Sequence, residues 1–199
     1  MIKLVYGGSG SGKSSFAEQL AVSCGAERKY YVATMQVYDD EGRAKVRRHQ
    51  EMRADKGFVT IEQPVDIVIV AGHIARETEA AETDKAVPTA KTAVLLECVT
   101  NLVANEMFPP ECLSGIEETV VVARIKSGLE KLFSCADDVV VVSGNVFDDG
   151  AEYDESTLSY MRALGTVNAF IASKSDEVYE VVAGIPIKLA HQSKCAELC

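Results

Sequence analysis

The chain has 199 residues, of which 47 % are apolar and 25 % charged, a balance that excludes a disordered chain and a disulfide-stapled miniature. Its formal charge of −10 argues against a nucleic-acid partner or an anionic membrane surface, so any anionic ligand must meet a local cationic pocket. No apolar run approaches the roughly 18 residues of a membrane span, and the first residues lack a signal-peptide pattern, so we expect a cytoplasmic protein.

Short apolar runs alternate with segments of helical spacing along the chain. In order, the runs are Ile2–Tyr6, Tyr30–Ala33, Phe58–Ile61, Ala93–Leu96, Val139–Val142, Val178–Val182 and Ile185–Leu189, and the helical segments are 13–24, 40–56, 64–77, 115–134 and 155–173. This alternation predicts an α/β fold, with helices on both faces of a mostly parallel central sheet. Ile185–Leu189 closely follows Val178–Val182 and is expected to return as an antiparallel edge strand at the C-terminal end. We expect a single domain over residues 1–190 and a disordered tail over 191–199.

The sharpest pattern lies between the first expected strand and the first expected helix. It fits G-x-x-x-x-G-K-[ST] and reads Gly7-Gly8-Ser9-Gly10-Ser11-Gly12-Lys13-Ser14. Glycines allow a tight turn that points successive N–H groups at phosphate oxygens, and the helix adds the positive end of its dipole. Lys13 is expected to reach the β- and γ-phosphates, and the Ser14 hydroxyl to ligate Mg²⁺. A Gly/Ser-rich turn with an exposed lysine is the simpler alternative, but the position between strand and helix favours phosphate binding.

A second anchor for Mg²⁺ is expected at the end of a neighbouring buried strand. Glu97 directly follows an apolar run, so its carboxylate would lie at the sheet edge where α/β proteins bind ligands. We therefore predict that Glu97 and Ser14 share the metal, although an ordinary loop glutamate would give the same pattern. Thr34 and Glu62 follow the second and third expected strands and are further candidates for metal or nucleoside contacts.

Residues 43–53 are strongly cationic, with five basic residues and one acidic residue. At helical spacing Lys45, His49 and Arg53 form one stripe. A solvated charged face is the ordinary explanation of such a run. Flanking cations, however, disfavour the imidazolium form, and a neutral His49 is suited to attack an α-phosphorus and hold a phosphoramidate. Composition alone leaves both interpretations open.

Several short motifs occur in a fixed order along the chain. They are the phosphate loop, Tyr31-Val32-Ala33-Thr34, an Asp-Asp-Glu turn leading to Arg48-His49-Gln50-Glu51-Met52-Arg53, Leu95-Leu96-Glu97-Cys98-Val99-Thr100-Asn101-Leu102, Gly165-x-x-Asn168, and the segment from Glu177 to Pro186. Together they resemble the bifunctional adenosylcobinamide kinase/adenosylcobinamide-phosphate guanylyltransferase family of cobalamin biosynthesis, from residue 1 to about 189.

The resemblance implies a three-layer, RecA-like P-loop NTPase fold and two reactions. The first phosphorylates the aminopropanol hydroxyl of adenosylcobinamide with ATP or GTP. The second transfers GMP from GTP to that phosphate through a guanylylated histidine, which corresponds to His49. Lys13 would then be catalytic, Arg53 and the loop would contact nucleotide, and the corrinoid would be the small-molecule partner. A homotrimer with active sites near subunit boundaries is also implied.

Departures from the family pattern remove positive charge near the expected site. Gly10 stands where the family commonly has an arginine before Ser-Gly-Lys. Leu158 and Met161 stand where two basic residues often precede the glycine–asparagine motif, with Arg162 one position away. Ser143–Phe147 also differs from the Thr-Asn-Glu-Val type. These changes leave the nucleotide machinery whole but leave open the balance between the two activities.

Two other functions remain open from the sequence. A P-loop kinase for a different small-molecule acceptor would need the loop and Glu97 but not His49. A non-catalytic, nucleotide-dependent switch would bind GTP without turnover.

Overall fold

The computed structural model describes residues 1–36, 56–82, 90–112, 115–147 and 152–189. The expected helix over 40–56 and the expected tail over 191–199 lie outside the described residues, apart from Lys56 at the helix end. The same is true of His49 and Arg53.

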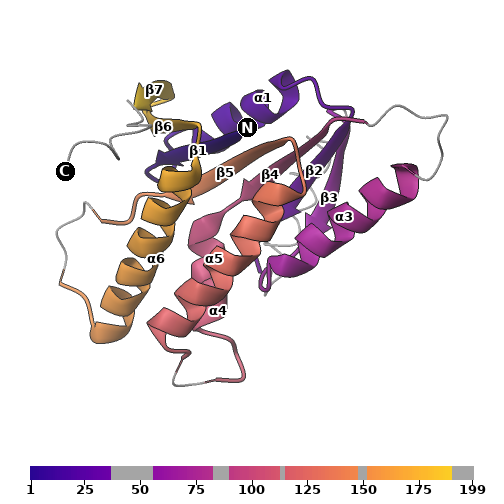
Figure 1. Cartoon of the computed structure of the whole chain (residues 1–199). Helices are drawn as coiled ribbons and strands as arrows, with labels where there is room; N and C mark the ends of the chain where they lie inside the picture. Colours follow the sequence, from indigo (N-terminus) through magenta and orange to yellow (C-terminus); the bar gives the residue numbers. More distant parts are fainter. Residues whose placement is uncertain (37–55, 83–89, 113–114, 148–151, 190–199) are drawn as a thin grey trace, which may run out of the picture.

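Seven strands form one sheet in the order β3-β2-β4-β5-β1-β6-β7 (Figure 1). Their bounds are β1 Ile2–Gly7, β2 Arg28–Ala33, β3 Phe58–Glu62, β4 Thr92–Glu97, β5 Asp138–Gly144, β6 Glu177–Val182 and β7 Ile185–Leu189. Every neighbouring pair is parallel except β6 and β7, which are antiparallel. The predicted mostly parallel sheet with an antiparallel C-terminal edge strand is therefore confirmed.

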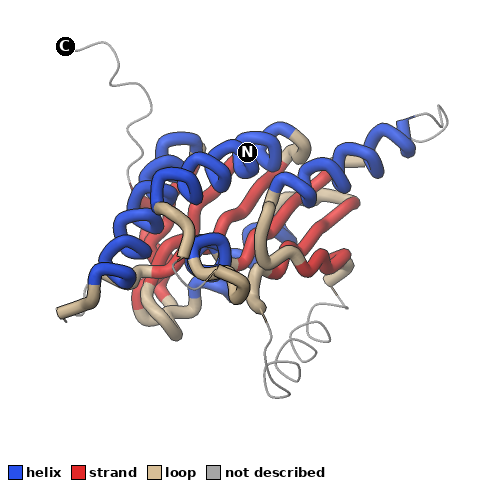
Figure 2. Tube along the Cα trace, turned by 90° about the horizontal axis from the view of Figure 1, so that it is seen from below, coloured by secondary structure: helices blue, strands red, loops and turns tan. Residues whose placement is uncertain are grey.

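Helices cover both faces of this sheet, as Figures 1 and 2 show. The described helices are α1 Lys13–Ser23, α3 Val68–Glu82, α4 Val99–Met107, α5 Glu118–Ser134 and α6 Glu155–Lys174. Helix α1 packs on β1, β4 and β5 from one face, whereas α3 to α6 pack against one another and against the other face. The result is the predicted three-layer arrangement. Among the described helices, none is long and apolar enough to span a bilayer.

Strand β5 shows why the central strands of the sheet have long runs of apolar residues. Val139 and Val141 contribute to the core under α3 to α6, whereas Val140 and Val142 contribute to the core under α1. Successive side chains of a strand point to opposite faces, so a strand covered on both faces needs an apolar side chain at every position. The whole of β5 is buried accordingly.

The helices depart from the sequence-based expectation at four places, one of which is the end of α3 at Glu82 rather than at residue 77. Helix α4 was not predicted, although its buried residues include Val99, Leu102, Val103 and Met107 at helical spacing. Helix α3 begins at Val68 rather than at residue 64, because Asp66 has a positive φ of 57° and breaks the helical backbone before it. Helix α5 begins at Glu118 rather than at residue 115.

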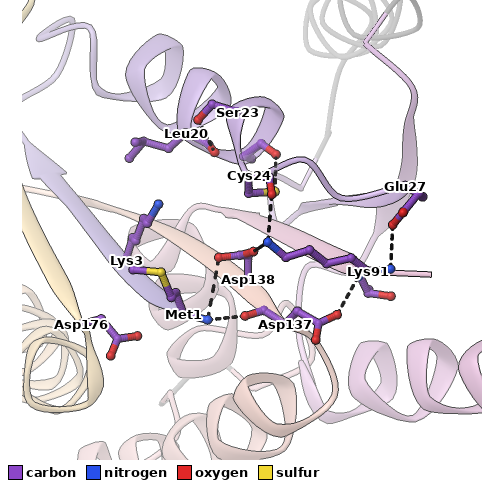
Figure 3. A network of polar contacts seen from close by, with 12 residues as sticks. Met1, Lys3, Leu20, Ser23, Cys24, Glu27, Lys91, Asp137, Asp138 and Asp176 are labelled. Carbon is purple, nitrogen blue, oxygen red and sulfur yellow. Dashed lines mark hydrogen bonds and ion pairs between the residues drawn. The ribbon is translucent and has the colours of Figure 1, made fainter. Parts of the chain in front are cut away.

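A polar network closes the amino edge of the sheet (Figure 3). The Lys91 ammonium lies 2.7 Å from the buried Asp138 carboxylate and donates to the carbonyl of Cys24 at 2.8 Å. The Thr92 amide donates to Asp137 at 2.8 Å. The hydrogen bond that Lys91 donates to the Asp138 carboxylate raises the pKa of Lys91, which remains a cation. These contacts join the starts of β4 and β5 to the end of α1, and so fix the register of the strands whose opposite ends carry the site.

Two helical glycines should respond in opposite ways to alanine. A Cβ at Gly128 of α5 would lie 2.4 Å from Ile67 Cγ2 and 3.2 Å from the Val68 amide nitrogen, and Ile67 is buried. Overpacking should lower the free energy of unfolding of Gly128→Ala by about 1–3 kcal/mol, despite the better helix propensity of alanine. Gly72 of α3 is exposed, and a Cβ there meets no described atom within 4 Å. Gly72→Ala should therefore raise the free energy of unfolding by up to about 1 kcal/mol.

Urea unfolding of both variants and the wild type measures these changes. If the free energy of unfolding changed in the same direction in both variants, the packing of α5 against the start of α3 would be contradicted.

Candidate functional site

The carboxyl ends of the parallel strands meet at one edge of the sheet. Pairing aligns Gly7 of β1 with Gly144 of β5 and aligns Glu97 of β4 with Ala33 of β2, whose own partner in β3 is Glu62. The loop with the glycine-rich pattern leaves this edge from the end of β1. The structure therefore brings the phosphate loop, Glu97 and Glu62 to the same side of the molecule, as the sequence predicted.

The loop from Gly7 to Ser14 folds back on itself through its own backbone. The Ser11 amide donates to the Gly8 carbonyl at 3.2 Å, and the Lys13 ammonium donates to the same carbonyl at 3.0 Å. Gly10 and Gly12 have positive φ values of 69° and 91°, which a residue with a Cβ rarely adopts. Two of the motif's glycines are thus required by the conformation of the loop.

Helix α1 begins directly at Lys13, and its N-terminus is open to a ligand. Its N-cap residue, Gly12, provides no side-chain hydrogen bond, and the first turn carries no acidic residue. The first amides of a helix need an acceptor and lie at the positive end of the helix dipole. The Ser11 hydroxyl is buried and has no hydrogen-bond partner in the described part of the chain. Phosphate oxygens would satisfy both the amides and this hydroxyl.

Glu97 lies on the same face of the sheet as α1. Its carboxylate accepts a hydrogen bond of 3.1 Å from the Tyr31 hydroxyl, and both Tyr31 and Leu95 belong to the core under α1. Because alternate residues of a strand share a face, Glu97 follows Leu95 toward α1. Ser14, in the first turn of that helix, is at the same edge.

The residues at this edge suit Mg²⁺. Mg²⁺ prefers oxygen ligands and is held in nucleotide sites by one or two protein groups together with substrate phosphates and waters. The Ser14 hydroxyl and the Glu97 carboxylate are hard oxygen donors of this kind. The uncapped phosphate loop beside them would supply the remaining ligands through a bound nucleotide.

Thr34 is buried, and its hydroxyl forms hydrogen bonds with the backbone of the protein itself. Its hydroxyl donates to the Cys98 carbonyl and accepts from the Cys98 amide, both at 2.7 Å, and its own amide donates to the Glu97 carbonyl at 3.0 Å. Cys98 therefore uses the one donor and one of the two acceptor lone pairs of the hydroxyl that the sequence suggested for ligand contact. These bonds fix the end of β4 and hence the position of Glu97.

Glu62 lines an open cleft of about 800 Å³ beyond the ends of β2 and β3. Apolar residues of its walls include Met35, Val65 and Ile116. Strand β3 is four strand spacings from β1, or about 19 Å. A nucleotide with its phosphates in the loop would have to extend along the sheet edge to bring its nucleoside to this cleft.

Asn105 organises the wall of this cleft. Its side-chain amide donates to the Thr34 carbonyl at 2.8 Å and to the Pro64 carbonyl at 3.0 Å. One residue of α4 thereby joins the segments that follow β2 and β3. Sequence analysis missed Asn105 because α4 was not predicted. It also missed Tyr31, since nothing in a strand sequence shows which neighbouring carboxylate a tyrosine reaches.

The positions that depart from the family pattern lie in three places: Gly10 in the loop, Leu158 and Met161 on α6, and Ser143–Phe147 at the end of β5 and after it. A Cβ at Gly10 would meet no described atom within 4 Å, so the loop has room there, but the backbone is left-handed. On α6 the basic residue near the expected positions, Arg162, is paired with Glu118 at 3.1 Å and Glu155 at 2.8 Å. The hydrogen bonds that Arg162 donates to Glu155 and Glu118 raise its pKa further. Its charge is thus neutralised within the surface of α5 and α6.

The asparagine of the Gly165-x-x-Asn168 motif contacts the end of β5. Asn168 of α6 accepts a hydrogen bond of 2.6 Å from the Ser143 hydroxyl. Tyr160, also on α6, donates to the Thr100 carbonyl at 3.3 Å, and burial raises its pKa to about 12. Tyr160 therefore remains a neutral donor at the start of α4, next to the segment that carries Glu97.

Comparison with known proteins relates most of the chain to one family. The sequence model of a family described as cobinamide kinase / cobinamide phosphate guanyltransferase matches residues 3–189. The chain is 31 % identical over 198 residues to the bifunctional adenosylcobalamin biosynthesis protein CobU of Escherichia coli (strain K12), covering 95 % of this chain and 99 % of that protein. It is 29 % identical over 197 residues to CobU of Salmonella typhimurium, covering 95 % and 99 %. Its identity to the bifunctional adenosylcobalamin biosynthesis protein CobP of Pseudomonas aeruginosa is 27 % over 191 residues, covering 95 % and 97 %.

Replacing the loop lysine should weaken nucleotide binding. A hydrogen bond to a charged group contributes about 1.5–3 kcal/mol, so Lys13→Ala should raise the dissociation constant for Mg²⁺–GTP by about tenfold to a hundredfold. Lys174→Ala is the control, because it removes the same charge from the C-terminal end of α6, where Lys174 is half exposed. It should leave the dissociation constant unchanged. Titration calorimetry measures both, and tight binding by Lys13→Ala would contradict the assignment of the loop.

Proposed function

Because the chain belongs to the cobinamide kinase / cobinamide phosphate guanyltransferase family, we propose that it catalyses both reactions in cobalamin biosynthesis. In the first, a nucleoside triphosphate, ATP or GTP, phosphorylates the aminopropanol hydroxyl of adenosylcobinamide. In the second, GMP is transferred from GTP to that phosphate, which yields adenosylcobinamide-GDP and pyrophosphate. The observation that carries this proposal is an uncapped phosphate loop on the face of the sheet toward which Glu97 also points.

In the kinase step the protein acts mainly by positioning and by charge stabilisation. The backbone amides at the start of α1 would hold the β- and γ-phosphates, and Lys13 would neutralise charge that develops on the bridging oxygen. Bound Mg²⁺, held by Ser14 and Glu97, would supply further charge neutralisation between the phosphates. Tyr31 would keep the Glu97 carboxylate in place through its hydrogen bond of 3.1 Å.

In the transferase step His49 is the proposed nucleophile. An imidazole nitrogen forms a bond to the α-phosphorus of GTP while the bond from that phosphorus to the bridging oxygen breaks, and pyrophosphate leaves with the electron pair. A phosphate oxygen of adenosylcobinamide phosphate then attacks the phosphorus and releases the histidine. The support for His49 is its cationic sequence setting and its motif, which lies within the matched span. Arg53 of the same motif, with Glu62 at the cleft, is proposed to contact the nucleotide.

We further propose a cytoplasmic location, the partners and the assembly of the protein. Four cysteines of the described residues carry free thiols, which supports a reducing cytoplasm. The corrinoid and the nucleotides are the proposed small-molecule partners, with no nucleic-acid partner. A homotrimer is the proposed assembly.

Labelling with GTP that carries ³²P at the α-position tests the nucleophile. Wild type should form a protein adduct that is labile in acid and stable in alkali, as a phosphoramidate is, and His49→Ala should form none. His73→Ala is the matched control, because His73 lies on α3 beside Glu77 and should label normally.

The same assay separates the competing functions. Transfer of the γ-phosphate to adenosylcobinamide without any α-label would show that the transferase half is wrong. Transfer to another acceptor only would favour a different small-molecule kinase. GTP binding with no turnover in the presence of adenosylcobinamide would favour a nucleotide-dependent switch.

The role of Glu97 is tested through its magnesium dependence. Glu97→Gln removes the charge but keeps the size, so the Mg²⁺ concentration for half-maximal phosphoryl transfer should rise on the order of tenfold or more. Glu130→Gln makes the same change on the exposed surface of α5 and should not shift it. An unchanged magnesium requirement in Glu97→Gln would exclude Glu97 as a metal ligand.

A further inference from the structure

The turn between β6 and β7 contacts the phosphate loop directly. The Gly184 amide donates a hydrogen bond of 2.8 Å to the Ser11 carbonyl. We propose that Gly184 is a positioning residue for phosphate binding: by holding the Ser11 carbonyl, it turns the Gly12 amide toward the nucleotide. This inference rests on the phosphate-binding part of the proposed function, and does not depend on the corrinoid or on His49.

The argument follows from the geometry of one peptide unit. The peptide bond between Ser11 and Gly12 is trans, and in a planar trans peptide the C=O and the N–H point in opposite directions. Since the Ser11 carbonyl points at the β6–β7 turn, the Gly12 N–H points away from the turn. A loop that binds an anion through successive amides needs each of them turned to the concave side. The hydrogen bond from the Gly184 amide to the Ser11 carbonyl fixes the orientation of the Gly12 amide before the ligand binds.

The close approach of β6 explains two glycines of the motif that phosphate contact alone does not require. A Cβ at Gly7 would lie 2.6 Å from the Val181 carbonyl oxygen, and a Cβ at Gly12 would lie 3.2 Å from the Gly184 Cα. By contrast, a Cβ at Gly8 would meet no described atom within 4 Å. Gly7 and Gly12 therefore lie where the loop touches the hairpin.

The turn is held firmly enough to support the loop. Strand β6 pairs with β1 in parallel, with Tyr6 opposite Glu180, so the residues that follow reach Gly7. Ala183 and Gly184 have positive φ values of 49° and 81°, and Val182 pairs with Ile185 across them. Positive φ at both central residues is the signature of the type I′ turns that suit the twist of a hairpin.

The test uses the full-length protein and inorganic tripolyphosphate, which carries phosphates but no nucleoside. Gly184→Pro removes the amide hydrogen and forces a negative φ, so the dissociation constant for tripolyphosphate, and for Mg²⁺–GTP, should rise by about tenfold. Gly184→Asn keeps the amide and tolerates a positive φ. A Cβ at Gly184 meets no described atom within 4 Å, so this variant should bind as wild type does.

Two controls separate positioning from general stability. Ile187→Pro disturbs the exposed strand β7 without altering the turn, and should leave tripolyphosphate affinity unchanged. The melting temperature is measured for each variant, and Gly184→Val, which keeps the amide but disfavours a positive φ, replaces Gly184→Pro if the latter does not fold.

Equal tripolyphosphate affinity in wild type and Gly184→Pro would overturn the inference, as would an equal loss in Gly184→Asn and Ile187→Pro. If wild type binds neither tripolyphosphate nor GTP, the proposed function fails with it. If wild type binds both and the Gly184 variants make no difference, the proposed function stands and only the role of the turn is wrong.

Discussion

The glycine-rich backbone at the end of β1, proposed to bind phosphate, is the feature on which the rest of the site depends. Amides can surround a phosphate only where the chain turns tightly and no side chain intervenes. Here the glycine-rich loop meets the turn between β6 and β7. Gly7 and Gly12 lack a Cβ where the hairpin of β6 and β7 approaches, and Gly10 and Gly12 adopt positive φ values. The net charge of −10 makes this local arrangement necessary, because the protein as a whole repels anions.

The sheet gives the loop its chemical neighbours. Parallel strands end at one edge, and the alternation of side chains along β4 sends Glu97 to the face that α1 covers. Thr34, Asn105 and Tyr31 then restrain the ends of β2 and β4 through hydrogen bonds to backbone and carboxylate. At the opposite edge, the contacts of Lys91 and Asp138 close the sheet with charged groups. Rigid packing at one edge thus leaves loops at the other to carry the ligand.

The fold was largely predictable because its signals are local. Apolar runs such as Val139–Val142 predicted the parallel strands, and the glycine-rich pattern between β1 and α1 predicted the loop and the position of Lys13. Helix α4 was not predicted, although its buried residues lie at helical spacing. The start of α3 was not predicted correctly. Nothing local in the sequence marks the positive φ of Asp66, whose amide donates to Glu106, a residue distant in sequence.

Long-range pairings in the site were beyond sequence reasoning for the same reason. No pattern shows that the Thr34 hydroxyl bonds the backbone of Cys98, or that Arg162 is neutralised by Glu118 and Glu155. Such contacts depend on how elements pack rather than on residue spacing.

A crystal structure with Mg²⁺ and a non-hydrolysable GTP analogue tests the central claim most directly. The account predicts the β- and γ-phosphates within hydrogen-bond distance of the amides from Gly12 to Ser14, and a metal ion between the phosphates, Ser14 and Glu97. Phosphates bound elsewhere on the sheet edge, with the Gly12 amide turned away from them, would contradict it.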